Sequence, residues 1–138
     1  MGNTDSTLDD QLRDACYDND YDKVVQLVAA GANVNAKGGG GWTPLHNAVV
    51  HGHQDISRFL IGAGCDVNIA ADNGSTSLHV AAYYGHHALV DLLIEHGADL
   101  YSRDRDGNTP LDEARKKSES SVLAILDVAI EEGKTITS

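Results

Sequence analysis

Two short blocks of this sequence each occur three times, at a fixed step of 33 residues. The first block reads TPLHNA at 43–48, TSLHVA at 76–81 and TPLDEA at 109–114. The second reads AAGANVN at 29–35, GAGCDVN at 62–68 and EHGADLY at 95–101. A period of this length is typical of arrays in which a unit buries its apolar face only against its neighbours. The chain is therefore expected to fold as a solenoid of stacked units.

Each unit is predicted to contain two helices, and the second unit shows the signals clearly. Thr43 stands where a helix N-cap is favoured, and Pro44 takes the first helical position, where a missing N–H costs nothing. Gly52 separates this helix from GHQDISRFLI, in which apolar residues recur at helical spacing on one face. Gly64 supplies the left-handed cap that ends the second helix. The other units repeat most of these signals.

This pattern resembles the ankyrin repeat, whose 33-residue period and T-P-L-H-x-A signature the chain matches in three registers. The resemblance implies an all-α solenoid of helix–turn–helix units with projecting β-turn fingers, forming one domain over residues 1–138. The expected units are 5–37, 38–70, 71–103 and 104–136, of which the first and last are caps. Small residues such as Ala48 and larger ones such as Leu60 should form parallel columns through the core.

Charge and composition exclude several classes of function. The formal charge is −11, and seven aspartates fall within the first 22 residues, which argues against nucleic acid or anionic lipid as a direct partner. No segment approaches the ~20 apolar residues that span a bilayer, and the N-terminus lacks the features of a secretory signal. A cytoplasmic or nuclear monomer without stable membrane insertion is expected. Cys16 and Cys65 should be reduced thiols.

No motif in the chain predicts catalysis. The glycine run at 38–41 lacks the GK[ST] of a phosphate loop and does not fit GxGxxG. Four of the seven histidines occupy positions of the repeat itself, and the other three form no compact ligand set. No Ser, His and acid trio can be nominated, and a small solenoid offers no deep pocket. We therefore predict no enzymatic activity, no cofactor and no metal site.

The resemblance places the binding surface on the concave face, which is made by the finger tips and the inner side of the first helices. Trp42 is expected at the tip of the second unit's finger, and Tyr17 belongs to the same face. Trp and Tyr are the types most enriched among residues that dominate interface energies. Alternatively, Tyr83 and Tyr84 pack partly under the neighbouring finger. The predicted partner-binding residues are Trp42, Val50, His51, Asp72, Asn73, Tyr83, Tyr84, Arg105, Asn108, Lys116 and Lys117.

The function expected from this reading is that of a non-catalytic adaptor, scaffold or inhibitor that binds another protein. The alternative is a targeting or regulatory module of a larger multidomain protein. Arg105, Lys116 and Lys117 make one end of the concave face basic. A partner is therefore expected to place apolar side chains against the aromatic residues and an acidic segment against the fourth unit.

Two modification sites are also predicted. The start MGNTDS fits the myristoylation pattern M-G-x-x-x-[ST] at Gly2, although such a short pattern also arises by chance. A single acyl chain would add only transient membrane association. Leu60 followed by DVN at 66–68 fits the L-x5-[DE]-[VI]-N pattern at which ankyrin-like proteins resemble substrates of an iron and 2-oxoglutarate asparaginyl hydroxylase, which points to Asn68.

Overall fold

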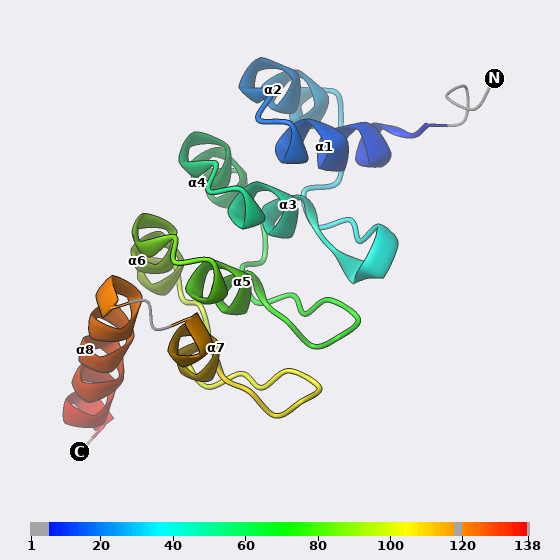
Figure 1. Ribbon diagram of the computed structural model, residues 1–138. Helices are drawn as coiled ribbons and strands as arrows, with labels where there is room; N and C mark the ends of the chain where they lie inside the picture. Colours follow the sequence, from blue (N-terminus) through cyan, green and yellow to red (C-terminus); the bar gives the residue numbers. More distant parts are fainter. Residues whose placement is uncertain (1–5, 118–119, 138) are drawn as a thin grey trace.

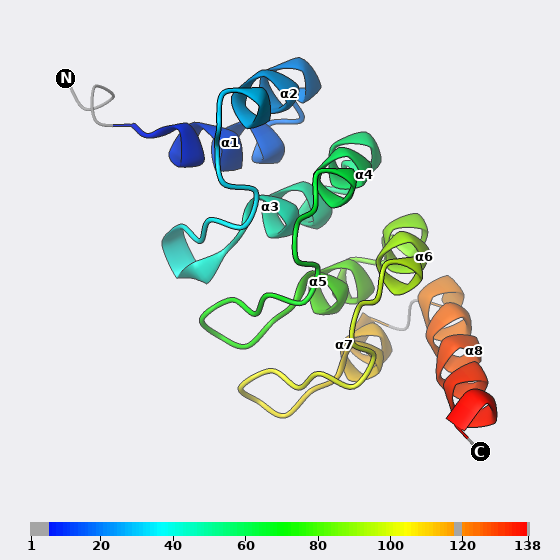
Figure 2. The ribbon, with the colours of Figure 1, turned by 180° about the vertical axis from the view of Figure 1, so that it is seen from behind.

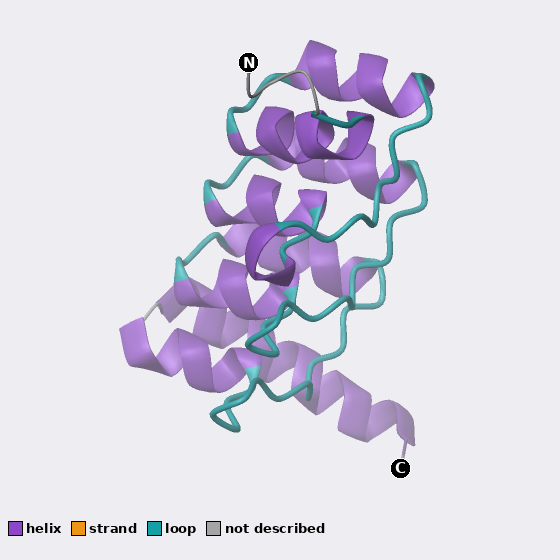
Figure 3. Cartoon of the chain, turned by 90° about the vertical axis from the view of Figure 1, so that its right-hand side faces the viewer, coloured by secondary structure: helices purple, strands orange, loops and turns teal. Residues whose placement is uncertain are grey.

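The computed structural model describes residues 6–117 and 120–137, which form eight α-helices and one 3-10 turn and contain no strand (Figure 3). The helices are α1 (Leu8–Tyr17), α2 (Tyr21–Ala29), α3 (Pro44–Val50), α4 (Gln54–Gly62), α5 (Ser77–Tyr83), α6 (His87–Glu95), α7 (Pro110–Lys117) and α8 (Ser120–Thr137). The 3-10 turn η2 covers Gly39–Gly41. The predicted all-α solenoid is confirmed.

The helices form two columns that run along the array. Figures 1 and 2 show α1, α3, α5 and α7 stacked in an inner column and α2, α4, α6 and α8 stacked beside them in an outer column. Three long loops project from the inner column on the side away from the outer one, and these are the predicted fingers. The concave face is therefore lined by the inner column and the fingers.

Threonine residues are the N-caps of the inner helices, as predicted. Thr43 and Thr76 lie in the extended region, and each accepts a hydrogen bond from the backbone N–H three residues later. That third residue is a histidine, His46 or His79, whose ring accepts a bond from the threonine N–H. Each pair thereby satisfies donors that a helix start leaves open.

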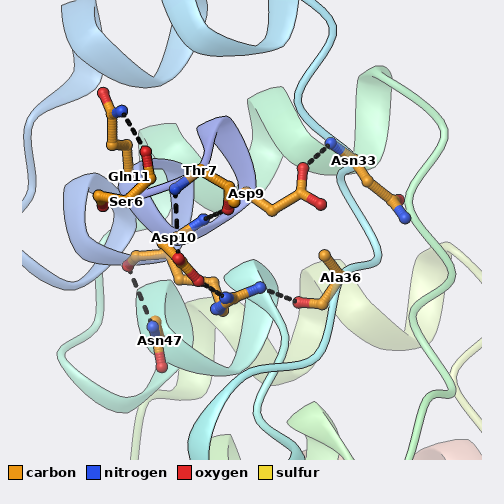
Figure 4. A network of polar contacts seen from close by, with 9 residues as sticks. Ser6, Thr7, Asp9, Asp10, Gln11, Asn33, Ala36 and Asn47 are labelled. Atoms are coloured by element: carbon orange, nitrogen blue, oxygen red, sulfur yellow. Dashed lines mark hydrogen bonds and ion pairs between the residues drawn. The ribbon is translucent and has the colours of Figure 1, made fainter. Parts of the chain in front are cut away.

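The first unit departs from the pattern because its inner helix starts earlier. Thr7 and Asp10 close a capping box, so that α1 has 10 residues where α3 has 7. The extra turn carries Asp9, which accepts from the N–H of Asn33 at 2.7 Å (Figure 4). Within α1, Arg13 pairs with Asp10. Arg13 also donates to the Ala36 carbonyl at 3.0 Å.

These contacts extend to the next unit. The side-chain amide of Asn47 in α3 donates to the backbone carbonyl of Arg13 at 3.0 Å (Figure 4). Arg13 thus contacts its own helix, the loop that follows α2, and the second unit. The side chain of Arg13 therefore joins α1 to the loop after α2, whereas its backbone carbonyl makes the contact with the second unit.

The core is one continuous cluster of small and medium-sized apolar side chains. Ala48, Ala81 and Ala114 are fully buried in the inner column, and Leu60 and Leu93 are fully buried in the outer one. Alanine at these positions allows the inner helices of neighbouring units to approach closely. The columns expected from the repeat register are confirmed.

This packing predicts the effect of Ala81→Leu. The larger side chain has no free volume in the centre of the inner column, so it should lower the free energy of unfolding by roughly 1–3 kcal/mol. Ala124→Leu, at an exposed position of α8, is the matched control and should change little. Urea unfolding of both variants measures the difference, and an unchanged midpoint for Ala81→Leu would contradict the packing described here.

Candidate functional site

The concave face contains a hollow of about 540 Å³ beside the first three inner helices. Its lining comes from three consecutive units. The lining residues are Tyr17, Trp42, Val50, His51, Tyr84 and His86, and we call this site the aromatic hollow. Four of them, Trp42, Val50, His51 and Tyr84, are among the predicted partner-binding residues.

Trp42 lines the aromatic hollow but does not lie at the finger tip, so this part of the prediction is wrong. The tip is the 3-10 turn at Gly39–Gly41, where Gly40 has a φ of 70° that glycine tolerates best. Trp42 follows in extended conformation, directly before the N-cap Thr43. The indole is half-buried against the core, with its centroid 5.4 Å from that of the His46 ring.

The aromatic side chains of the hollow hold one another in place. The rings of Tyr17 and His51 meet edge to face with centroids 4.3 Å apart, and those of Tyr84 and His86 are stacked at 6.3 Å. Tyr17 and Tyr84 each remain 51% exposed. The hollow therefore presents ring surfaces whose orientation is set before any partner arrives.

Two histidines fix the edge of the hollow to the backbone. The Nε2 atom of His53 lies 3.0 Å from the Tyr17 carbonyl, and that of His86 lies 3.1 Å from the Val50 carbonyl. Both carbonyls lie at the end of the inner helix in the preceding unit, so each imidazole joins two units. The sequence analysis placed both histidines at positions of the repeat but missed that His86 also lines the hollow. Its position two residues after Tyr84 is the signal that could have indicated it.

The two adjacent tyrosines have different environments. Tyr83 is half-buried, and the Nζ atom of Lys117 lies 5.2 Å from its ring centroid. Tyr84 meets the Tyr83 ring edge to face at 4.9 Å and turns toward the hollow. Covering by the neighbouring unit thus applies to Tyr83, whereas Tyr84 stays available.

The basic end of the concave face is partly neutralised by its own acids. Lys116 donates to Glu113 at 3.1 Å, and this bond raises the pKa of the Lys116 ammonium group. Burial opposes the charge of Asp104, yet hydrogen bonds from the N–H groups of Asn108 and Asp106 leave the pKa of that carboxyl below its usual value. Lys116, Lys117 and Arg105 are all exposed at this end.

Backbone bonds join the fingers to one another. The N–H of Asp72 donates to the Gly40 carbonyl, and that of Arg105 donates to the Asn73 carbonyl, both at 2.9 Å. Asn73 also accepts from the Ser75 N–H through its side chain, as expected of a turn residue. The Asn108 carbonyl contacts His79 at 2.8 Å. The predicted finger residues thus form a separate edge of the concave face, outside the aromatic hollow.

A second hollow of about 410 Å³ lies in the outer column, between α6 and α8. Its lining is mostly aliphatic and includes Ile94, Ile125 and Val128, with Asp91 and Glu132 as its charged members. Val128 is 56% exposed. The sequence missed this outer groove because a cap unit was expected to be polar on its free face.

Neither cysteine is suited to act as a nucleophile. Burial, with a smaller contribution from Cys65, raises the pKa of Cys16 to about 12. Burial and Asp66 raise the pKa of Cys65 to about 11. Both are free thiols, and so little thiolate forms near neutral pH.

Residues 6–117 and 120–137 contain no group of three side chains able to hold a metal ion. Within the same ranges, no helix combines the length and the apolar character required to cross a bilayer.

The two predicted modification sites stay predictions. Gly2 lies outside the described residues. Asn68 is exposed, but its side-chain amide donates to the Gly97 carbonyl at 3.0 Å and accepts from the Asp99 N–H at 2.8 Å. Hydroxylation at Asn68 would therefore require these bonds between units to open.

Comparison with known proteins gives two findings. A family model described as ankyrin repeats, in three copies, matches residues 12–104 and 63–135. The 2-5A-dependent ribonuclease of Homo sapiens is similar to this chain, with 51% identity over 47 residues. That segment is 33% of this chain and 6% of the ribonuclease, so the likeness concerns a short part of a much longer protein.

Proposed function

Because this chain belongs to the ankyrin repeat family, we propose that it is a non-catalytic module that binds a protein partner on its concave face. The observation that supports this most directly is the convergence of Tyr17, Trp42 and Tyr84, from three consecutive units, on one hollow. We further propose that it acts as a monomeric adaptor, scaffold or inhibitor in the cytoplasm or nucleus.

The energetics of interfaces favour this location. Tryptophan and tyrosine combine a large apolar area with few rotatable bonds, and truncating such anchors commonly costs ~2 kcal/mol or more. The edge contact of Tyr17 with His51 already restrains its ring, which reduces the cost of ordering it on binding. The outer groove contains no aromatic side chain among its lining residues, so it offers weaker anchors.

Affinity purification from cell lysate provides the first test. The protein with Trp42→Ala and Tyr84→Ala should lose partners that the unchanged protein retains. Val128→Ala, in the outer groove, is the matched control and should retain them. Loss of the partners with Val128→Ala alone would place the interface on the outer column and would contradict the proposal.

Binding kinetics give a sharper prediction for the captured partner. Trp42→Ala should leave association nearly unchanged and speed dissociation about tenfold or more, on the order of 1.4 kcal/mol, because it removes a buried anchor. The double variant Lys116→Glu and Lys117→Glu should instead slow association and flatten its dependence on salt, because rim charges act mainly during encounter. Surface plasmon resonance measures both rates. Unchanged rates for both variants would remove the concave face from the interface.

A second candidate is a targeting or regulatory module within a larger protein. The similarity to a short part of the human ribonuclease favours it, because a matching segment occurs there within a much longer chain. Mass spectrometry of the native polypeptide tests this directly. A native chain of 14.6 kDa would contradict this second candidate and leave the first unaffected.

A further inference from the structure

We propose that the aromatic hollow receives a cationic side chain, the guanidinium or ammonium group of an arginine or lysine in the partner. This inference rests on the proposed function, since it names what the partner inserts on the concave face. It differs from the apolar side chain that the aromatic composition alone suggests. Three features of the structure support it.

The first feature is the chemistry of the lining. Three aromatic rings and two imidazoles surround the hollow, and its six lining residues include neither lysine nor arginine. The face of an aromatic ring carries negative charge and attracts a cation within ~6 Å of its centroid. Tryptophan, here Trp42, is the strongest of the aromatic partners in such contacts. An incoming cation would therefore meet aromatic rings without competition from a cation among the lining residues.

The second feature is the surrounding charge. Asp14 and Asp18 are exposed, and they lie three residues before and one residue after Tyr17. Neither takes part in an ion pair with the described residues. The chain as a whole carries −11, so its field draws cations toward this end of the concave face and repels anions.

The third feature is a cation that already lies against a ring on the same face. The Lys117 ammonium group is 5.2 Å from the Tyr83 ring centroid, within the usual range for this contact. Tyr84 is the next residue, but its ring is perpendicular to that of Tyr83 and lines the hollow. A partner's cation over Tyr84 would repeat, between two molecules, the contact that Lys117 makes within one.

Trp42 is the only tryptophan of the chain, so its fluorescence reports on the hollow. The test titrates the protein with choline and, separately, with 3,3-dimethyl-1-butanol, which has the same shape without the charge. Choline should change the fluorescence in a saturable way and bind about fivefold more tightly than the alcohol. Sodium chloride at equal concentration controls for ionic strength.

Two substitutions at Tyr84 separate a ring face from apolar area. Tyr84→Phe keeps the ring and should bind choline nearly as well as the unchanged protein. Tyr84→Leu keeps a large apolar side chain and should weaken choline binding about threefold or more, because no ring face remains. Tyr84 is half exposed, so both variants should fold, and Tyr17→Phe with Tyr17→Leu provides a second pair.

Equal binding of choline and the alcohol, or full binding by the leucine variants, would show an apolar site and overturn the inference. Absence of a saturable response to choline would overturn it as well. Neither result bears on the proposed function, because partner capture is tested through Trp42 and Tyr84 irrespective of the charge of the inserted group. If the double variant Trp42→Ala and Tyr84→Ala loses its partners while the unchanged protein fails to bind choline, the concave face remains the proposed interface and the proposal of a bound cation is rejected.

Discussion

Replacing Leu78 by alanine should remove about 2–5 kcal/mol from the free energy of unfolding. Leu78 is fully buried in α5, within the core that joins neighbouring units. Truncation leaves a cavity at a position flanked by a unit on each side, so both interfaces of the third unit should weaken. In an array whose stability is a sum over neighbouring interfaces, such a loss affects the whole molecule.

Urea unfolding followed by circular dichroism and by Trp42 fluorescence measures this effect at two places. Leu8→Ala is the matched control, because Leu8 is 39% exposed at the start of α1. It should change the free energy of unfolding by no more than about 0.5 kcal/mol. An equally small effect for Leu78→Ala would mean that α5 is not packed as described.

Replacing His46 by alanine should cost about 2–4 kcal/mol, because it leaves buried polar groups without partners. Its Nδ1 atom accepts from the Thr43 N–H at 3.2 Å, so Nε2 carries the proton and donates to the Ser75 carbonyl at 2.8 Å. The imidazole is fully buried. His96→Ala, at an exposed position after α6, is the matched control and should be nearly neutral.

The same histidine predicts a dependence of stability on pH. Burial, aided by Lys37 and His79, holds the pKa of His46 below its ordinary value of 6.5 despite the bond to Ser75. The unfolded chain therefore binds this proton at a higher pH than the folded protein does, and the free energy of unfolding falls as the pH drops through 6.5. Unfolding at about pH 7.5 and about pH 5.5 should show a smaller decline for His46→Ala than for the unchanged protein. An equal decline would assign the effect to other groups.

Features that recur between units could be predicted from the sequence. Thr43 and His46 return at the same step as Thr76 and His79, and the capping bonds of both pairs are present. Gly64 has the left-handed φ of 92° that its place after the second helix requires. Repetition provides several independent copies of the same signal, so that a single ambiguous residue does not mislead.

Features that occur once were predicted less well. The position of Trp42 depends on the 3-10 turn at Gly39–Gly41, which no other finger contains among the described residues. The different environments of Tyr83 and Tyr84 arise because Lys117 of the next unit lies over the Tyr83 ring. The periodicity of the sequence does not reveal this contact. The sequence therefore predicted the face and four of the six residues that line the hollow, whereas the depth of the hollow and the contribution of His86 had to come from the structure.

The bonds of His46 and His79 across the array end on main-chain oxygen atoms, those of Ser75 and Asn108. Every residue type provides such an oxygen, so these two bonds place no demand on the side chains at positions 75 and 108. A library that randomised Asp72, Arg105 and Asp106, and kept Asn73 because its side chain accepts from the Ser75 N–H, would leave these bonds in place. The bonds that join the units therefore use other atoms than the finger side chains available for recognition. New binding specificities can be selected on the fingers without changing the helices.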